Sequence, residues 1–144
     1  MRVVVFVKSD ESTEAGSLPT EESLARMGKF NEELVEAGVM LAGEGLHPAS
    51  ASRRVRLSHG GATVTGGRAA EARDVVAGFW MWKVDSIEEA VDWVKRIPNA
   101  DGTFDGEYEI RPVMEADDFG EAFTPELREQ EERLREKTEA TLSR

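Results

Sequence analysis

Apolar residues along this chain fall into short β-branched or aromatic runs that alternate with longer amphipathic stretches. The run from Arg2 to Lys8 and the run from Ala77 to Val84 each place apolar side chains on both faces of an extended segment. Enrichment of this kind favours strands, and a strand that is apolar on both faces is covered on both sides. Two central strands are therefore predicted.

Two further stretches carry apolar residues at helical spacing. Thr20 is the predicted N-cap of the first helix, which ends before Gly38. The second helix begins at Ser86, where Glu89 completes a capping box, and Pro98 ends it. Each helix has one apolar stripe, so each covers one layer of a sheet.

The remaining extended segments complete an antiparallel sheet and a hairpin that turns at His59-Gly60-Gly61. Pro112 is typical of an edge strand or of a strand end. The order β-α-β-(hairpin)-β-α-β predicts an α+β fold, in which a ferredoxin-like antiparallel sheet carries an inserted hairpin and a C-terminal helical tail follows. The other predicted strands are residues 39–42, 52–58, 62–65 and 107–114, and residues 9–19 and 66–74 are predicted loops.

Two helices cover only one face of such a sheet, so the second apolar face needs another partner. At roughly 25 cal/mol per Å² of apolar surface, leaving its aromatic residues in water costs several kcal/mol. A second copy packed sheet to sheet removes that exposure and gives a symmetric homodimer. The tail helix is the alternative cover, although its apolar residues are few.

Composition indicates one ordinary domain that needs no disulfide. The chain has 144 residues, no cysteine and a net charge of −11, so neither thiol chemistry nor an oxidising compartment is expected. This acidity opposes binding to nucleic acid and to anionic membranes. The N-terminal run has only five consecutive apolar residues, too few for a signal peptide or a membrane span, so we expect a cytoplasmic location.

The C-terminal segment differs from the rest in charge. Residues 115–144 carry 10 acidic and 5 basic residues, almost half of the net charge. We therefore expect a ferredoxin-like domain over residues 1–114, and an acidic linker with a C-terminal helix over 115–144. Thr124-Pro125-Glu126 supplies the N-cap, a proline at N1 and an acid at N2 of that helix.

The stretch Gly43-Glu44-Gly45-Leu46-His47-Pro48 holds the chain's most suggestive acid/base pair. Two glycines and a proline predict a backbone bend, and on a bend the side chains of Glu44 and His47 can converge. A histidine near a carboxylate is a tunable proton carrier, so these two residues are the candidate catalytic groups. The alternative is structural: Glu44 accepts bonds from backbone amides in the bend, and His47 is half-exposed.

Three arginines are the candidate ligand-binding residues. Arg54, Arg56 and Arg111 fall on the less apolar faces of their predicted strands, and buried arginines need an acidic partner or a bound anion. One reading is a cleft for a small anionic ligand, and the other is a solvated hairpin edge with cross-strand ion pairs. His47 and His59 lack metal-ligand spacing, so we expect no metal, and no motif indicates a cofactor.

Several segments together resemble the YCII-related superfamily and, within it, the DGPF-domain proteins. The resemblance runs from Met1 to about Met114. The threonine, Asp-Gly-Pro-Phe and downstream glutamate of the family motif fall on Thr65 to Ala69 and on Glu71. Gly67 and Glu71 match, whereas the Asp, the Pro and the Phe do not. The other matching segments are the N-terminal strand, Phe30 to Leu34 with Gly38, Ala42 to Pro48, Gly78-Phe79, Glu89-Ala90, Arg96 to Pro98 and Glu109 to Val113.

The resemblance implies a ferredoxin-like fold that forms a dimeric α+β barrel. It implies a small-molecule-binding enzyme, lyase- or hydrolase-like, with a cleft at the dimer interface. Some relatives use a His–Asp pair, but no aspartate matches beside His47 here, so no dyad is carried over. The alternative is a non-catalytic binding or interaction module, a companion of sigma-factor-type transcription regulation.

Overall fold

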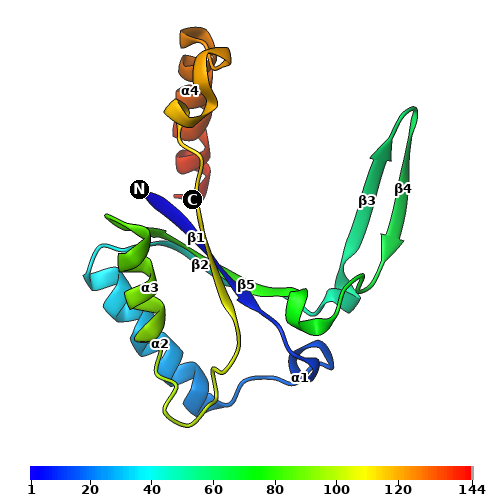
Figure 1. The fold of residues 1–144 in the computed structure, drawn as a ribbon, viewed down its shortest axis with the longest axis vertical. Coiled ribbons are helices and arrows are strands. Elements are labelled where there is room, and N and C mark those ends of the chain that lie inside the picture. The colour runs from blue at the N-terminus through cyan, green and yellow to red at the C-terminus, as the bar shows by residue number, and fades with distance from the viewer. Residues whose placement is uncertain (144) are drawn as a thin grey trace. The chain divides into compact units, whose positions relative to one another are not determined.

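The computed structural model describes residues 1–143, and its elements follow the predicted order (Figure 1). The strands are β1 (Arg2–Lys8), β2 (Met40–Gly45), β3 (Arg53–Ser58), β4 (Gly61–Gly66), β5 (Val76–Lys83) and β6 (Tyr108–Pro112). The helices are α1 (Glu11–Glu14), α2 (Glu21–Glu36), α3 (Ile87–Lys95) and α4 (Pro125–Leu142), with short 3₁₀ turns η1 (Ala49–Ala51), η2 (Ala72–Asp74) and η3 (Ala116–Ala122).

Four strands form one antiparallel sheet in the order β2-β5-β1-β6, and β3 pairs with β4 in a separate two-stranded sheet. In the central pair, Val5 lies opposite Trp80 and Val3 opposite Trp82. The first strand, β1, therefore lies between β5 and β6, and β2 lies beside β5 at one edge, which is the strand order of a ferredoxin-like sheet. The predicted α+β fold with an inserted hairpin and a C-terminal helix is confirmed.

Local signals set the helix ends. The Thr20 side chain accepts from the amide of Ser23 at the start of α2, and Ser86 accepts from the amide of Glu89 at the start of α3. In a capping box, the Glu89 carboxylate would accept from the amide of the N-cap residue Ser86. Here it accepts from the amide of the preceding residue, Asp85, at 2.6 Å. Both helices therefore begin where the sequence predicts.

Helices α2 and α3 lie side by side on one face of the four-stranded sheet (Figure 1). The Phe30 ring of α2 meets the Trp93 ring of α3 edge to face, with centroids 6.3 Å apart, and Arg96 pairs with Glu33 at 2.9 Å. The core lies between these helices and the sheet. Its buried apolar residues are Val3, Val5, Phe30, Leu34, Val39, Trp80, Trp82, Val84, Ala90 and Ile97.

The opposite face of the sheet has no such cover in residues 1–112. Side chains alternate along a strand, so the neighbours of the buried Val5 and Trp80 point to this second face. Val4, Phe6, Phe79 and Met81 lie there, and each is only partly buried. We call this surface the open face, and its apolar character agrees with the two-faced strands seen in the sequence.

The glycine-rich segment departs from the expected bend, because β2 continues through Gly43, Glu44 and Gly45, and its one irregularity lies earlier, between Met40 and Ala42. A Cβ at Gly43 would lie 2.7 Å from Cδ1 of Trp80, and a Cβ at Gly78 would lie 2.9 Å from the carbonyl oxygen of Glu44. These glycines therefore allow β2 and β5 to pair closely. The irregular backbone begins only at Leu46.

Three smaller expectations also change. The loop predicted over residues 9–19 contains α1, whose N-cap Asp10 accepts from the amide of Thr13 at 2.7 Å. The last sheet strand, expected over 107–114, ends at Pro112, and it is an edge strand, as the proline indicates. Residues 66–74, expected as a loop, include the single turn η2. No helix among residues 1–143 is long and apolar enough to cross a membrane.

Residues from Val113 onward form a second compact unit, separate from Met1–Pro112. Within it, Arg128 bonds Asp117 at 3.0 Å and its guanidinium lies 5.5 Å from the centre of the Phe123 ring. The Thr124 side chain caps α4 as predicted. Glu131 and Arg135, four residues apart on α4, form an ion pair at 2.6 Å.

Candidate functional site

A cavity of about 470 Å³ lies at the base of the β3–β4 hairpin. Three chain segments form it: the stretch after β2, the two ends of the hairpin, and the start of β5. We call it the basic cavity. Its lining residues are Leu46, His47, Pro48, Ala49, Ala51, Ser52, Arg54, Gly67, Arg68, Ala69, Ala70, Val75 and Val76.

The polar lining of the basic cavity is cationic or neutral. His47, Arg54 and Arg68 contribute ring or guanidinium nitrogens, and no lining residue is acidic. The Arg54 guanidinium donates to the carbonyl oxygen of Gly67, and Arg68 is 3.3 Å from the Glu11 carboxylate. One arginine therefore faces only a neutral carbonyl, and the other has an exposed acid as its partner.

The wall of the cavity is fixed by Glu14, which lies at the end of α1. Its carboxylate accepts from the amide of Ala49 at 2.9 Å and from the hydroxyl of Ser9 at 2.8 Å. The hydroxyl of Ser52 lies 2.6 Å from the carbonyl oxygen of Ala49 and 3.2 Å from that of Gly67. These bonds join both ends of the hairpin to the segment that carries His47.

This arrangement suits an anion better than a cation. Guanidinium groups bind carboxylate and phosphate oxygens through paired, charge-assisted hydrogen bonds, and an imidazole can donate or accept a hydrogen bond. Within residues 1–143, no three histidine, aspartate or glutamate side chains gather in a way that could hold a metal ion.

A second cavity, of about 420 Å³, lies between α2 and the sheet, and we call it the apolar cleft. Trp80 forms its floor and donates from Nε1 to the Asn31 side chain at 3.0 Å. Gly43 leaves the space that this indole occupies. The lining residues are Val7, Pro19, Ser23, Leu24, Met27, Asn31, Met40, Gly43, Glu44, Gly45, Ala77, Gly78, Phe79, Trp80, Phe104 and Tyr108.

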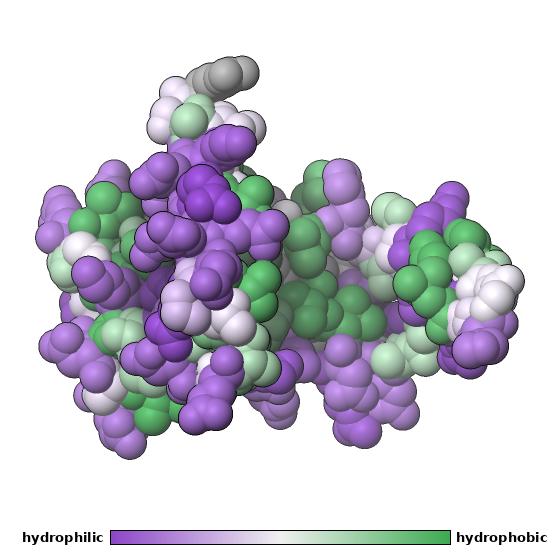
Figure 2. Space-filling view, turned by 90° about the horizontal axis from the view of Figure 1, so that it is seen from above, coloured by the Kyte–Doolittle hydropathy of each residue, from purple (hydrophilic) through white to green (hydrophobic). Residues whose placement is uncertain are grey.

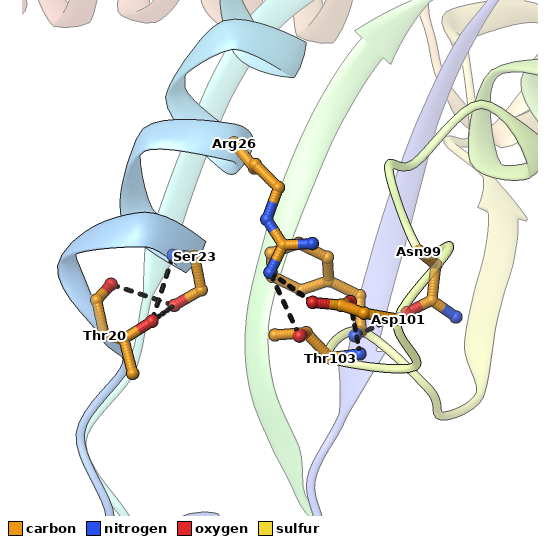
Figure 3. Close-up of polar contacts among 7 residues, drawn as sticks. Thr20, Ser23, Arg26, Asn99, Asp101 and Thr103 are labelled. Atoms are coloured by element: carbon orange, nitrogen blue, oxygen red, sulfur yellow. Dashed lines mark hydrogen bonds and ion pairs between the residues drawn. The ribbon is translucent and has the colours of Figure 1, made fainter.

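One rim of the apolar cleft is held by an ion pair between α2 and the loop before β6 (Figure 3). Arg26 lies 2.8 Å from Asp101 and donates to the Thr103 hydroxyl at 3.1 Å. Its guanidinium also lies 5.7 Å from the centre of the Phe104 ring. The bond from Arg26, with the amide of Thr103, holds the pKa of the Asp101 carboxyl well below its ordinary value.

The same rim contains Tyr108, which is partly buried and lies near the negative charge of Asp105. Its hydroxyl donates to the carbonyl oxygen of Phe104 at 2.9 Å. Burial, and then the charge of Asp105, raise the pKa of the Tyr108 hydroxyl. The phenol is therefore a neutral hydrogen-bond donor at the edge of the cleft, and its bond helps to fix Phe104.

The five predicted site residues are divided among different places. His47 and Arg54 both line the basic cavity, whereas Glu44 lines the apolar cleft. Arg56 and Arg111 line neither of these two cavities. Arg111 lies opposite Val4 and Glu44 opposite Phe79, so the register places both on the open face. Glu44 is on the edge strand β2 and therefore borders the apolar cleft as well. The expected convergence of Glu44 and His47 depended on a bend that the structure replaces with a strand.

Sequence reasoning did not select Arg68, which lines the basic cavity, or Glu14, which is outside the lining and holds Ala49 in the wall. Arg68 lies inside the segment Thr65–Glu71 that carries the altered family motif, so a signal for it was present. Glu14 had none, because nothing in a predicted loop marks an acid that will accept from the amide of a residue 35 positions away. Likewise, Arg26 and Asp101 meet only through the packing of α2 beside the loop.

Comparisons with known proteins show what this chain is similar to. The model of the YCII-related domain matches residues 1–117. An uncharacterised protein of Rhizobium meliloti (strain 1021) is 32% identical over 115 residues, which is 78% of this chain and 92% of that protein. The solved 5-chloro-2-hydroxyhydroquinone dehydrochlorinase of Burkholderia phenoliruptrix aligns with 79% of this chain and 94% of its own, at 11% identity and a TM-score of 0.42. A likeness this weak carries no argument about the reaction of this chain.

Proposed function

This chain belongs to the YCII-related family, and on that premise we propose that it binds a small organic anion in the basic cavity. The finer placement among DGPF-domain proteins stays a prediction. The observation that carries the proposal is the lining of the cavity. Arg54, Arg68 and His47 come from segments on both sides of the hairpin base, and no acidic side chain lies among them.

The size and charge of the cavity define the class of ligand. A volume of about 470 Å³ is within the range of small-molecule sites. Two guanidinium groups favour a carboxylate or phosphate group on the ligand. The remaining wall consists mainly of alanine, valine, leucine and proline side chains, which suits a short apolar body.

His47 is the proton carrier in this proposal. Its imidazole can take a proton from a bound organic anion or return one, as lyase- and hydrolase-like reactions require. Arg54 and Arg68 hold the anionic group and fix the substrate in the cavity. Glu44 lines the other cavity, so the Glu44–His47 pair is not part of this mechanism within one chain. The alternative function, a companion of a sigma factor, gains no support from the fold or from the relatives.

Matched arginine variants test the binding step. Succinate, benzoate and inorganic phosphate are titrated into the protein by calorimetry, and thermal unfolding is followed in parallel, because a ligand of the folded state raises its stability. We expect at least one probe to bind, and Arg54→Gln to weaken that binding by about tenfold or more. Arg56→Gln is the control, because Arg56 is on the same strand but outside the cavity.

Two results would contradict the proposal. Either none of the three probes binds, or Arg54→Gln and Arg56→Gln weaken binding to the same extent. The catalytic step is tested separately with His47→Gln and a panel of small carboxylates followed by NMR. Turnover should disappear while probe binding stays within about threefold, and turnover that persists in this variant would remove His47 from the reaction.

A homodimer is the second part of the proposal. The open face presents Val4, Phe6, Phe79 and Met81 from the two central strands, and residues 1–112 supply no second layer to cover them. An apolar sheet face of this kind is stable when another sheet packs on it at about 10 Å. A second copy placed on it brings Glu44 and Arg111, with their partner counterparts, to one interface, where they remain candidate ligand contacts.

Sedimentation tests the dimer directly. We expect a dimer at micromolar concentration, and we expect Phe79→Asp to convert it to monomer, because a charge on a packed apolar face is strongly unfavourable. Val35→Asp is the matched control, since Val35 is 62% exposed on α2, on the other side of the sheet. A stable wild-type monomer at that concentration would contradict the proposal.

A further inference from the structure

The β3–β4 hairpin, residues 53–66, carries an apolar face that nothing in residues 1–112 covers. We call it the arm. Val55 lies opposite Val64, and Leu57 opposite Ala62, so these side chains share one face. Val55 is 58% exposed, Val64 63% and Leu57 80%. Figure 2 shows hydrophobic surface on the arm, at the right of the view, and on the recessed surface beside it.

The other face of the arm is polar and basic. Arg54 lies opposite Thr65, and Arg56 opposite Thr63. The arm therefore has one apolar and one polar face, as a strand pair that packs on a core does. Every residue of both strands is nevertheless exposed. An isolated two-stranded hairpin is marginally stable in water, and an amphipathic one with an exposed apolar face marks a surface for a partner.

Charge decides what kind of surface the arm fits. The arm contains three arginines and no acidic residue, so it contributes +3 to a chain whose net charge is −11, and the remainder carries −14. Two arms packed on each other would bring like charges together, which is unfavourable. The body of the chain, defined as residues 1–112 without the arm, is acidic and carries the open apolar face.

The arm points away from the sheet of its own chain (Figure 1), so its apolar face and the open face of the same chain do not meet. We infer that the arm packs against the body of a second copy of this chain, with the two arms exchanged about a two-fold axis. Such an exchange closes after two copies. It buries the apolar face of each arm at the edge of the interface that the two open faces form, and it places each basic arm beside an acidic body. The inference rests on the proposed homodimer and assigns the arm its role in that dimer.

Two substitutions on adjacent residues of β4 test the inference. Val64→Asp places a charge on the apolar face of the arm, whereas Thr63→Asp places the same charge on the polar face, opposite Arg56. We expect Val64→Asp to raise the dimer dissociation constant at least tenfold and Thr63→Asp to change it by less than about threefold. Sedimentation measures both dissociation constants. Far-UV circular dichroism should show the wild-type secondary structure in both variants, because the substituted residues are exposed. Equal effects of the two variants would overturn the inference.

Photo-crosslinking identifies the surface that the arm meets. A benzoyl-phenylalanine is introduced at position 57, in light and heavy isotope-labelled chains that are mixed before irradiation, and position 63 serves as the control. We expect adducts between light and heavy chains that join position 57 to peptides of the body. Adducts confined to one chain, adducts that join arm to arm, or no adduct in a dimeric sample would each overturn the arm exchange.

The outcomes separate this inference from the proposals on which it rests. A monomeric wild-type protein contradicts the homodimer itself. A dimer that Phe79→Asp dissociates, but that Val64→Asp leaves intact, keeps the sheet-face dimer and removes the arm. Anion binding is measured independently, because neither Leu57 nor Val64 lines the basic cavity.

Discussion

The central sheet and the arm both carry an apolar face on paired antiparallel strands, but they differ completely in burial. In β5, every second residue from Gly78 to Trp82 is buried beneath the helices, whereas no residue of β3 or β4 is. β5 is apolar on both faces, and only the face beneath the helices is buried, whereas the arm alternates apolar and polar side chains and is exposed on both faces. The difference shows that alternation defines a face, and that only a second layer determines whether this face is buried.

The largest expected contrast compares the same substitution in the two regions. Leu34→Ala, in the fully buried layer of α2, should lower the free energy of unfolding by about 3–4 kcal/mol, because it removes packed methyl groups and leaves a cavity. Leu57→Ala, on the arm, should change it by less than about 0.5 kcal/mol at protein concentrations that keep the chain monomeric. Urea unfolding followed by tryptophan fluorescence measures both. A large loss in the second variant would show that the arm is packed within its own chain.

A smaller contrast lies within β2. Gly43→Ala should cost about 1–3 kcal/mol, because its Cβ would lie 2.7 Å from Cδ1 of Trp80 and 2.8 Å from Cε of Met40. Gly45→Ala is the control on the same strand, since no atom lies within 4 Å of its added Cβ. The control should be neutral or stabilise by less than about 1 kcal/mol. Thermal unfolding compares the two, and equal losses would contradict the close approach of β2 to Trp80.

The smallest expected effect concerns the Arg26–Asp101 ion pair, which lies beside the helix-covered face of the sheet. No ion pair of this kind forms within the arm. Arg26 lowers the pKa of Asp101 in the folded state, so this pair contributes stability above the unfolded pKa of about 3.9, and the contribution is lost as pH falls below it. Asp101→Asn should therefore reduce stability slightly at pH 7 and flatten its decline between about pH 4 and pH 2.

Asp92→Asn is the control for this acid-side measurement, because Asp92 makes no ion pair among residues 1–143. Its urea midpoint should follow the wild-type pH dependence. If Asp101→Asn instead retains the full wild-type decline, the Arg26–Asp101 pair does not contribute to folding stability in solution.

Much of the architecture could be predicted because its signals are local. Thr20, Ser86 and Thr124 cap helices where the sequence places them, and the turn at His59 and Gly60 joins the hairpin as expected. The candidate site was less accessible. His47 and Arg54 were selected and do share a cavity, but Arg68 and Glu14 join them only because the ends of the hairpin and α1 meet in space.

The sequence by itself determined the order of strands and helices, the two apolar faces of the central strands and the acidity of the chain. Those properties depend on residue type and on spacing along one segment. Only the tertiary structure decided that β2 continues through Gly43, because that depends on the fit of Trp80 from another strand. It also decided that Glu44 and His47 belong to different cavities, since a continuous strand separates side chains that a bend would bring together.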